Sequence, residues 1–439
     1  MREIDIGADD LVAKLLALAA TETVCILDSA GVSHLGSHLL IAGVRPVDIH
    51  EVSEADPDAA LLILDREFGR QGLAGVFTMS YEFGAKMHSI ASQNSDDNTE
   101  PDAFLALFDN LIVHDYNTGK TFLAGDERKF VRTEDLITGA ARFSPGNSGA
   151  ASGARSNFSR EEYIAAVECI KEQIRAGLTY QTNLTQQLTV ELRGNQTPEN
   201  IFANLRKSHP APFGSFINRQ SSTVVSASPE RFFRVTANKI TASPIKGTRP
   251  RGSTSGHDNR LRSELLSSAK DRAENTMIVD LMRNDLGRIC EFGSVKVERL
   301  CELEVHPTLF HLVSTVTGSL RKKLPHSAII KALFPSGSIT GAPKLSTMRI
   351  IASIEKSPRG LSMGSVGINI PSGFPGLTPV FEMNVAIRTM VIRGNEAVFN
   401  VGGGVVIDSD PSNEYDEALL KARALLAAAG APEALDTSS

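Results

Sequence analysis

Residues 213–245, FGSFINRQSSTVVSASPERFFRVTANKITASPI, decide the fold class. Four short runs in this stretch, FGSFI, TVVSAS, RFFRVT and KITASPI, are rich in β-branched and aromatic residues and alternate with polar turns, which predicts strands. No helical pattern separates one run from the next, and such consecutive strands pair antiparallel. We therefore expect an α+β fold with largely antiparallel sheets packed as a sandwich and helices outside.

The sequence on both sides of this stretch adds further elements. A helix is expected after Ser159, because Ser159 and Glu162 form the S-x-x-E pattern of a capping box and apolar residues recur over 163–174 at helical spacing, with Gly177 placed to cap the end. Further strands are expected at 180–192, 294–300, 364–370, 380–392 and 397–403, and further helices at 198–208, 259–284, 325–333, 343–355 and 411–429.

The chain divides into two main segments by composition. Residues 144–157, SPGNSGAASGARSN, hold little to bury and predict a linker or long surface loop. The segment 1–143 then forms an N-terminal domain, 158–430 a second domain, and 431–439 a tail. In the first segment we expect a helix over 9–20, a strand over 24–27 and a hairpin over 110–124; residues 92–102 are polar and predict a loop.

Composition and charge exclude several classes of protein. Hydrophobic residues make up 41% of the 439 residues and charged residues 22%, which is typical of a globular chain. The net charge of −6 argues against a nucleic-acid or anionic-membrane partner, and no apolar run reaches the ~18 residues of a membrane helix. The acidic N-terminus does not resemble a signal peptide, and four scattered cysteines without CxxC spacing favour reduced thiols in the cytoplasm.

Two acidic pairs are candidates for a metal site. Asp271 and Glu274 lie three residues apart, as do Glu414 and Glu417, so each pair shares one face of its expected helix. Two such pairs brought together would repel one another unless a cation lay between them, and hard oxygen ligands suit Mg²⁺. The alternative is that both pairs are solvated helix faces.

A basic loop and two glycine-rich segments are the other candidate sites. Lys246, Arg249 and Arg251 crowd the loop PIKGTRPRG (244–252); a lysine near other cations and away from water becomes a nucleophile at neutral pH, whereas the alternative is a solvated loop. The segment FPSGSITGAPK (334–344) runs into Pro343, a favoured first helical position, and offers free N–H groups to an anion. Gly402–Gly404 follows an expected strand and permits close approach of a ligand, although tight turns would explain both glycine-rich segments.

Taken together, these segments resemble the chorismate-utilising enzymes, the family that includes anthranilate synthase and aminodeoxychorismate synthase component I. The resemblance covers 158–427 in family order, and more loosely the N-terminal segment through ILDS (26–29) and GLAGVFTMSYEFG (72–84). The matching stretches are YQTNLTQ (180–186), SPERFF (228–233), PIKGTRPRG (244–252), KDRAENTMIVDLMRNDLGRIC (270–290), FHLVSTVTG (310–318), FPSGSITGAPK (334–344), AIRT (386–389) and GGGVVIDSDPSNEYDEALLKA (402–422).

The resemblance implies a role for each matching residue. Glu274 and Glu417 are similar to the family's Mg²⁺ ligands, with Asp271 and Glu414 supporting them through metal-bound water, and Glu230 is similar to the general acid that protonates the departing C4 hydroxyl of chorismate. The residues that resemble the substrate-binding set are Gln181, Gly247, Thr248, His311, Thr340, Arg388, Gly402, Gly404 and Lys421.

Two positions distinguish members of the family. Relatives that add water carry a lysine base where this chain has Gln181, which argues against isochorismate or salicylate synthesis. Anthranilate synthases usually carry alanine at the position of Lys246, and the lysine resembles the aminating relatives, in which its amine is proposed to attack C2 of chorismate. The resemblance therefore implies conversion of chorismate and ammonia to 4-amino-4-deoxychorismate, for 4-aminobenzoate and folate synthesis.

Other readings remain open at this level. The runner-up is anthranilate synthase component I, and a non-catalytic chorismate-binding relative is a third possibility. No cysteine lies in a glycine-flanked nucleophile turn, so ammonia is expected from a separate glutamine amidotransferase or from free ammonium. The family's aromatic residues around a Gly-x-x-Gly strand are absent from 362–368, SMGSVGI, which leaves room for a variant substrate or weak activity.

Overall fold

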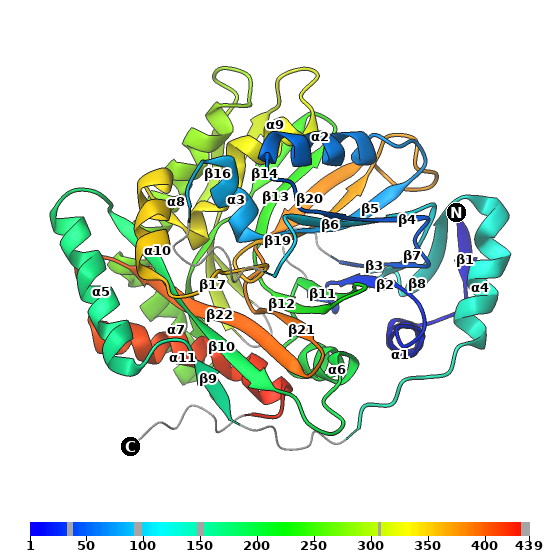
Figure 1. The fold of residues 1–439 in the computed structure, drawn as a ribbon, viewed down its shortest axis with the longest axis horizontal. Coiled ribbons are helices and arrows are strands. Elements are labelled where there is room, and N and C mark those ends of the chain that lie inside the picture. Colours follow the sequence, from blue (N-terminus) through cyan, green and yellow to red (C-terminus); the bar gives the residue numbers. More distant parts are fainter. Residues whose placement is uncertain (33–37, 92–98, 147–152, 306–308, 432–439) are drawn as a thin grey trace.

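The computed structural model describes residues 1–32, 38–91, 99–146, 153–305 and 309–431. Two large sheets form the molecule, and every strand pairing in them is antiparallel (Figure 1). The first sheet has twelve strands in the order β1 (Arg2–Ile4), β8 (Lys120–Gly125), β7 (Asn110–Asp115), β3 (Leu39–Val44), β2 (Val24–Asp28), β11 (Phe213–Asn218), β12 (Thr223–Ser228), β21 (Thr389–Arg393), β22 (Glu396–Val405), β10 (Gln181–Glu191) and β18 (Gly341–Ala342), with β9 (Ala154–Ser156) also on β10.

The second sheet has ten strands. Their order is β15 (Ile245–Pro250), β17 (Leu309–Ser319), β14 (Lys239–Ala242), β13 (Arg231–Thr236), β20 (Val380–Asn384), β19 (Ser365–Ile370), β5 (Ala74–Met79), β6 (Ala103–Phe108) and β4 (Asp48–Val52), with β16 (Lys296–Val305) on the free side of β17.

Apolar side chains from both sheets meet in one buried cluster, which we call the inter-sheet cluster. The first sheet contributes residues such as Cys25 and Ile217, and the second contributes Val76, Phe104 and Ile368. Contact between the inner faces of two sheets defines a sandwich. The expected α+β class, with antiparallel sheets packed as a sandwich, is confirmed.

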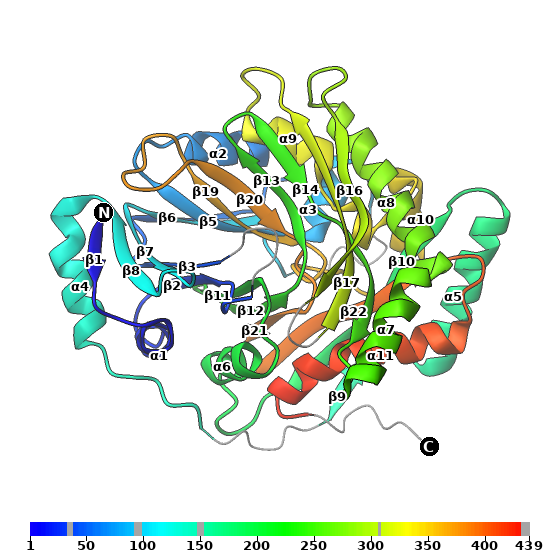
Figure 2. The same cartoon turned by 180° about the vertical axis from the view of Figure 1, so that it is seen from behind.

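Helices cover the outer faces of the sandwich (Figures 1 and 2). One apolar cluster joins α1, α6 and α11 to the first sheet, and another joins α2, α3, α8 and α9 to the second. The helices are α1 (Ala8–Leu18), α2 (Pro57–Phe68), α3 (Tyr81–Met87), α4 (Phe130–Gly139), α5 (Arg160–Arg175), α6 (Pro198–Ser208), α7 (Ser255–Ser267), α8 (Ala269–Gly287), α9 (His326–Leu333), α10 (Lys344–Ile354) and α11 (Pro411–Ala428), with 3₁₀ turns η2 (Glu127–Lys129) and η3 (Gly337–Ile339).

Most of the expected elements are present near their expected bounds. The hairpin expected over 110–124 is β7 and β8, and the helix expected after Ser159 is α5, with both hydrogen bonds of the capping box formed. Gly177 follows the end of α5 with a φ of +73°. The apolar face of α5, including Tyr163, packs against β10 and α11.

Four details of the sequence interpretation were wrong. The helix expected over 259–284 is two helices, α7 and α8, divided at Ser268, whose side chain caps α8. The strand expected over 380–392 is β20 and β21, which belong to different sheets. Gly402–Gly404 lies inside β22 instead of after it, and Pro343 is the N-cap of α10, not its first residue.

Strands from both sides of 144–157 are hydrogen-bonded in the same sheets. β2 pairs with β11 in the first sheet, and β5 pairs with β19 in the second. The segments 1–143 and 158–430 therefore share both sheets. The linker at 144–157, the loop at 92–102 and the tail at 431–439 lie partly outside the described residues, so their assignment stays a prediction.

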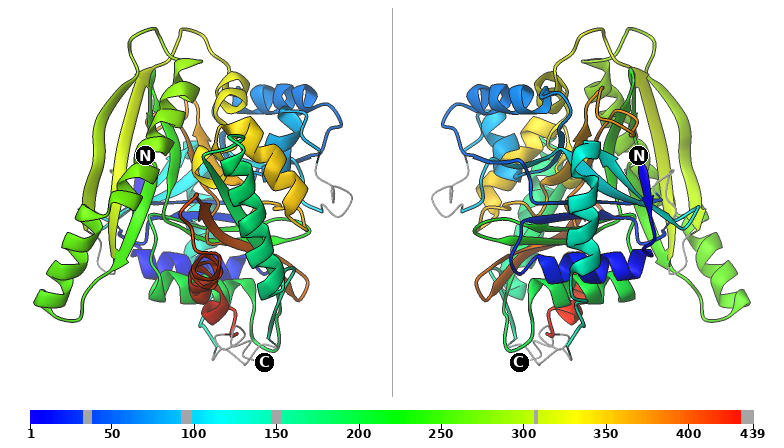
Figure 3. Two further views of the ribbon diagram at one scale, coloured as in Figure 1. Left: turned by 90° about the vertical axis from the view of Figure 1, so that its left-hand side faces the viewer. Right: turned by 90° about the vertical axis from the view of Figure 1, so that its right-hand side faces the viewer.

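The β15–β17 end of the second sheet positions the site described below. α7 and α8 run beside these strands on one side of the molecule, as Figure 3 shows. Within the described ranges, no helix is long and apolar enough to cross a membrane.

Candidate active site

Lys246 lies on β15, where an irregularity in the strand shapes its surroundings. The pairing of β15 with β17 shifts register between Lys246 and Thr248, and the intervening Gly247 has a φ of +82°. A Cβ at Gly247 would lie 2.9 Å from Leu265 Cδ1 and 3.0 Å from Asp271 Cβ, so only glycine lets β15 approach α7 and α8 this closely. The Lys246 ammonium donates to the carbonyl of Ser338 at 3.3 Å.

Glu230 is the second predicted catalytic group, and it lies buried between β12 and β13. Its backbone is fixed at both ends, because its N–H donates to Ser228 Oγ at 3.3 Å and its carbonyl accepts from Val385 N–H at 3.0 Å. The carboxyl group takes hydrogen bonds from the Ser338 side chain and the Ile245 backbone, and it faces Lys246. The structure therefore brings the two predicted catalytic residues together.

Burial alters the protonation of both groups. Desolvation raises the pKa of Glu230 to about 7, against the opposing effects of Ser338 and Lys246. Desolvation also lowers the pKa of Lys246, while Glu274 and Glu230 act to raise it and Lys421 acts to lower it. Near neutral pH this site can hold a protonated carboxylic acid beside an amine that loses its proton more readily than usual.

The cause predicted for the reactive lysine was wrong in part. The Arg249 guanidinium donates to Glu264 at 2.9 Å and to Asp271 at 3.2 Å, so its charge is used on α7 and α8. Arg251 donates to Asp258 at 2.8 Å. Neither arginine is among the charges that act on Lys246; burial is the main cause of its lowered pKa.

The two acidic pairs lie on α8 and α11, near enough for their charges to interact. A Cβ at Gly403 would lie 3.2 Å from Glu414 Oε2 and 3.9 Å from Glu417 Oε1, so both carboxylates of α11 lie over β22. Glu274 on α8 feels the charges of Asp271 and Glu414, and its pKa is raised, first by burial and then by these two carboxylates.

Ammonium groups balance part of this negative charge. Lys421 lies 2.8 Å from Glu417 and donates to the carbonyl of Gly402 at 2.9 Å, and Lys270 lies 3.7 Å from Glu414. Burial acts to raise the pKa of Glu417, but Lys421 and the other nearby lysines outweigh it and lower that pKa. The solvated-face alternative is weakened, because Glu414 is only 4% exposed, although Glu417 is exposed.

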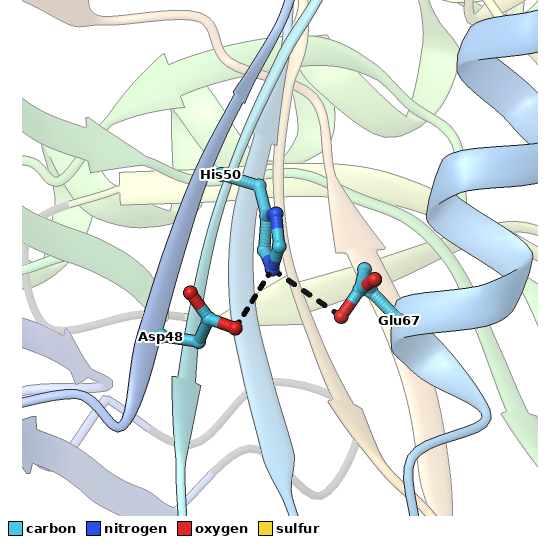
Figure 4. A group of neighbouring side chains, drawn as sticks. All are labelled: Asp48, His50 and Glu67. Atoms are coloured by element: carbon cyan, nitrogen blue, oxygen red, sulfur yellow. Dashed lines mark ion pairs between the residues drawn. The ribbon is translucent and has the colours of Figure 1, made fainter.

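The four carboxylates of the two acidic pairs are ligands that suit a hard cation, but they are not close enough together to enclose one. The carboxylates of the two pairs do not place three ligand atoms within 4.8 Å of one another; in the described part of the chain that spacing occurs at Asp48, His50 and Glu67 (Figure 4). There Arg70 Nη1 lies 2.8 Å from Asp48 and 3.0 Å from Glu67, so a guanidinium already supplies the cation. That second cluster is an ion-pair network joining β4 to α2.

Close pairing of β10 with β22 forms another wall of the site. A Cβ at Gly402 would lie 1.8 Å from the backbone carbonyl oxygen of Leu184, so this position admits no side chain; a Cβ at Gly404 would lie 2.0 Å from Gln181 Nε2 and would displace that amide. Gln181 Oε1 and Asn183 Nδ2, on one face of β10, are buried without a hydrogen-bond partner in the described residues. A buried polar atom without a protein partner calls for another explanation, such as a bound ligand, ion or water.

The remaining predicted binding residues lie at the edges of this region. Thr248 Oγ1 and His311 Nδ1 are 2.8 Å apart across β15 and β17. The Thr340 hydroxyl donates to Ser336 O at 3.0 Å, and the Thr340 carbonyl accepts from Asn183 N–H at 2.8 Å. These residues hold the 334–344 loop and the β15–β17 strands in place around the two catalytic candidates.

Arg388 is placed near the site by its backbone alone. It lies where the chain crosses from β20 to β21, with a φ of +50°, and its carbonyl accepts from Ala227 N–H at 3.0 Å, three residues before Glu230. Burial lowers the pKa of its guanidinium, which makes no ion pair or hydrogen bond with the described residues. Its charge acts on His209 and is not among those acting on Lys246.

The segment without the family's aromatic residues has its own contacts. The Ser362 hydroxyl accepts from Asn400 N–H at 2.9 Å, and Ile368 packs in the inter-sheet cluster. Ile368 therefore faces the interior of the sandwich.

Sequence reasoning missed several residues that shape the site. Ser338 contacts both Lys246 and Glu230, but its run of small residues gave no sign of this. Ser409 donates to Glu414 at 2.6 Å. Buried Arg359 donates to the carbonyls of Ile339 and Asn183, both at 2.7 Å, and so ties η3 to β10.

Comparison with known proteins defines the family. The family model of the chorismate binding enzymes matches residues 40–427, and the chain belongs to this family. A relative from Oryza sativa subsp. japonica named probable aminodeoxychorismate synthase, chloroplastic, is 38% identical over 389 residues, which cover 80% of this chain and 43% of that protein. Aminodeoxychorismate synthase component 1 of Klebsiella aerogenes is 35% identical over 355 residues, which cover 81% of this chain and 76% of the relative.

A solved structure shares the fold. The crystal structure of anthranilate synthase component I from Streptococcus pneumoniae TIGR4 superposes with a TM-score of 0.77 at 25% identity, covering 90% of this chain and 93% of that one. The chain thus spans less than half of the rice protein's length but nearly all of this component I structure.

Proposed function

We propose that this chain is the chorismate-aminating component of an aminodeoxychorismate synthase, which converts chorismate and ammonia to 4-amino-4-deoxychorismate. The observation that carries the proposal is the pairing of Lys246 with Glu230: an amine with a lowered pKa faces a carboxylic acid with a pKa of about 7. This pairing supplies a nucleophile and a proton donor at the same pH. The relatives from rice and Klebsiella support it by their names and identity.

The proposed reaction uses each group once in a balanced sequence. The unprotonated Lys246 amine attacks C2 of chorismate, the ring double bond shifts, and the C4 hydroxyl departs as water with the proton of Glu230. Ammonia then attacks C4, the double bond shifts back, and the C2–N bond to Lys246 breaks. The new C4 ammonium group gives its extra proton to the ionised Glu230, which returns the site to its starting state.

We propose Mg²⁺ as the cofactor of this site, held by Glu274 and Glu417 with Asp271 and Glu414 behind them. The α11 carboxylates lie over β22, and Glu274 of α8 is near enough to feel the charge of Glu414; both observations support this assignment. When bound, the ion would anchor a substrate carboxylate and stabilise negative charge. Lys270 and Lys421, which now balance these carboxylates, would have to move aside or share them.

We propose a glutamine amidotransferase as the source of ammonia. Three of the four cysteines are buried, and the exposed Cys169 lies on α5. A cysteine nucleophile for glutamine hydrolysis needs access and a lowered pKa, whereas burial raises the pKa of Cys25 and Cys290. The buried cysteines therefore do not suit this role, and free ammonium is the alternative source.

A product assay tests the proposal. The purified chain is incubated with chorismate, ammonium and Mg²⁺, and the products are separated by chromatography; anthranilate is recognised by its fluorescence. We expect 4-amino-4-deoxychorismate. Anthranilate as the sole product would favour the second candidate, anthranilate synthase component I, to which the likeness to the Streptococcus structure also points. Unchanged chorismate would favour a non-catalytic relative.

Lys246 variants test the covalent step. Lys246→Arg keeps the charge but cannot form the C2 adduct, and Lys246→Ala removes both; we expect both to lose most aminodeoxychorismate formation and the alanine variant to shift toward anthranilate. Intact-protein mass spectrometry with chorismate but no ammonia should show an adduct on the wild type alone. Lys239→Arg is the matched control, because Lys239 is exposed on β14 and pairs with Glu298. Near-normal rates for Lys246→Arg would contradict the covalent role.

A further inference from the structure

Ser338 touches both catalytic candidates through different atoms. Its carbonyl accepts the hydrogen bond of the Lys246 ammonium at 3.3 Å, and its side chain is hydrogen-bonded to Glu230. Ser338 is 6% exposed. One buried residue of a 3₁₀ turn therefore contacts the amine from β15 and the carboxyl group from the β12–β13 junction.

The turn that carries Ser338 is held on several sides. Ser336 caps η3, accepting from Ser338 N–H at 3.4 Å, and the two serine hydroxyls lie 3.1 Å apart. A Cβ at Gly337 would lie 2.5 Å from Leu281 Cδ2, so the turn packs directly on α8. Arg359 donates to the next carbonyl, that of Ile339, at 2.7 Å. A turn fixed in this way can hold its neighbours at a set separation.

Resting on the proposed function, we propose that Ser338 is a positioning residue for the reaction: its hydroxyl orients the Glu230 carboxyl group and its carbonyl orients the Lys246 amine. The two contacts act on different catalytic groups, so Ser338 sets the distance and angle between the proton donor and the nucleophile. Neither contact requires Ser338 to touch the substrate.

The hydroxyl contact also has a definite effect on titration. A hydroxyl that donates to a carboxylate stabilises its charged form and lowers its pKa. The groups that face the Glu230 carboxyl are the Ile245 N–H and the Lys246 ammonium from β15 and the Ser338 hydroxyl from η3. Removing the hydroxyl removes one of three groups that oppose desolvation, so Glu230 should keep its proton to higher pH.

Ser338→Ala tests the proposal, since it deletes the hydroxyl and keeps the carbonyl for Lys246. We expect the alkaline limb of the turnover–pH profile to move upward by about half to one pH unit, with turnover lowered and KM little changed. Ser338→Thr, which restores a hydroxyl, should return the limb toward its wild-type position. Ser346→Ala is the matched control, because Ser346 is a half-buried serine whose hydroxyl donates to Leu178 O.

A second readout needs no turnover. Protein labelled with ¹³C-glutamate is titrated by NMR, and Glu230→Gln assigns the Glu230 carboxyl signal; this signal should titrate at higher pH in Ser338→Ala than in the wild type. If the Glu230 signal titrates at higher pH in Ser338→Ala but the wild type makes no aminodeoxychorismate, the proposed function is overturned and the Ser338–Glu230 contact stands. An unchanged Glu230 titration overturns the positioning role. If Ser338→Ala fails to fold, Ser338→Cys, with a weaker donor of similar size, takes its place.

Discussion

Glu230→Gln should make the protein less active and more stable. Burial raises the pKa of Glu230 from 4.5 to about 7, so the folded protein binds this proton more tightly than the unfolded chain does. The ionised folded state therefore carries a free-energy cost that is absent below pH 4.5, grows between pH 4.5 and 7, and is complete above pH 7. A shift of about 2.5 pH units corresponds to at most about 3.4 kcal/mol.

The cost converts to a measurable melting temperature. At ~2.1 cal/mol/K per residue, unfolding the whole chain carries an entropy of about 0.9 kcal/mol/K, so Glu230→Gln should raise Tm by up to about 4 °C at pH 8. The rise should be smaller at pH 5, where the wild-type carboxyl group is largely protonated. The glutamine amide has one acceptor oxygen where the carboxylate has two, and it loses the charge attraction to Lys246, so the observed gain will fall below this bound.

Turnover should change in the opposite direction. Loss of a general acid typically costs about 10²–10⁴-fold, and wild-type turnover should itself decline as the pH rises through about 7. Differential scanning calorimetry at pH 5 and pH 8 and the chromatographic assay give the two measurements. Glu396→Gln, at an exposed carboxylate, should change neither. Unchanged turnover together with an unchanged Tm at pH 8 would refute the assignment of Glu230 as a buried proton donor.

Three further perturbations probe other parts of the site. Excess chelator should abolish turnover, and Glu274→Gln should do the same without lowering Tm, because one fewer carboxylate lessens the repulsion; full activity in chelator would exclude the metal. Gly404→Ala would place a Cβ 2.0 Å from Gln181 Nε2, so we expect a stability loss of about 1–3 kcal/mol and a raised KM for chorismate, measured by thermal melting and steady-state kinetics. Arg359→Ala strands the buried Glu355 carboxylate that it now binds at 2.7 Å and should cost about 3–5 kcal/mol, seen as a lower Tm; an unchanged Tm would contradict the structural role of this pair.

Local signals in the sequence predicted elements where a cap or a turn fixes them. Ser159 and Glu162 form the predicted capping box, and α11 begins at Pro411, where the helix over 411–429 was expected to begin. The break at Ser268 carries a similar signal, since the Ser268 side chain accepts from Asp271 N–H three residues later. It was overlooked because the helical composition continues on both sides of it.

Long-range features could not be predicted from local pattern. The apolar run over 380–392 continues through Arg388, and only the positions of two sheets require the chain to cross there. Spacing alone left the acidic pairs open as solvated faces, because α8 and α11 meet only in the folded protein. The two arginines are close to Lys246 in sequence, and their charges were therefore expected to act on it. In the structure, the irregularity at Gly247 and the acidic residues of α7 and α8 direct both guanidinium groups away from Lys246.

The shared sheets have a consequence for the way the chain folds as it is made. One edge of β5 is completed by β19, which begins at Ser365, 286 residues after β5 ends at Met79. At about 5–20 residues per second, a ribosome needs roughly 14–57 s to synthesise the intervening chain. Throughout that interval the nascent N-terminal segment presents an unpaired strand edge, which is a template for aggregation. A chaperone that binds extended apolar strands would therefore act on residues 74–79 before β19 leaves the ribosome.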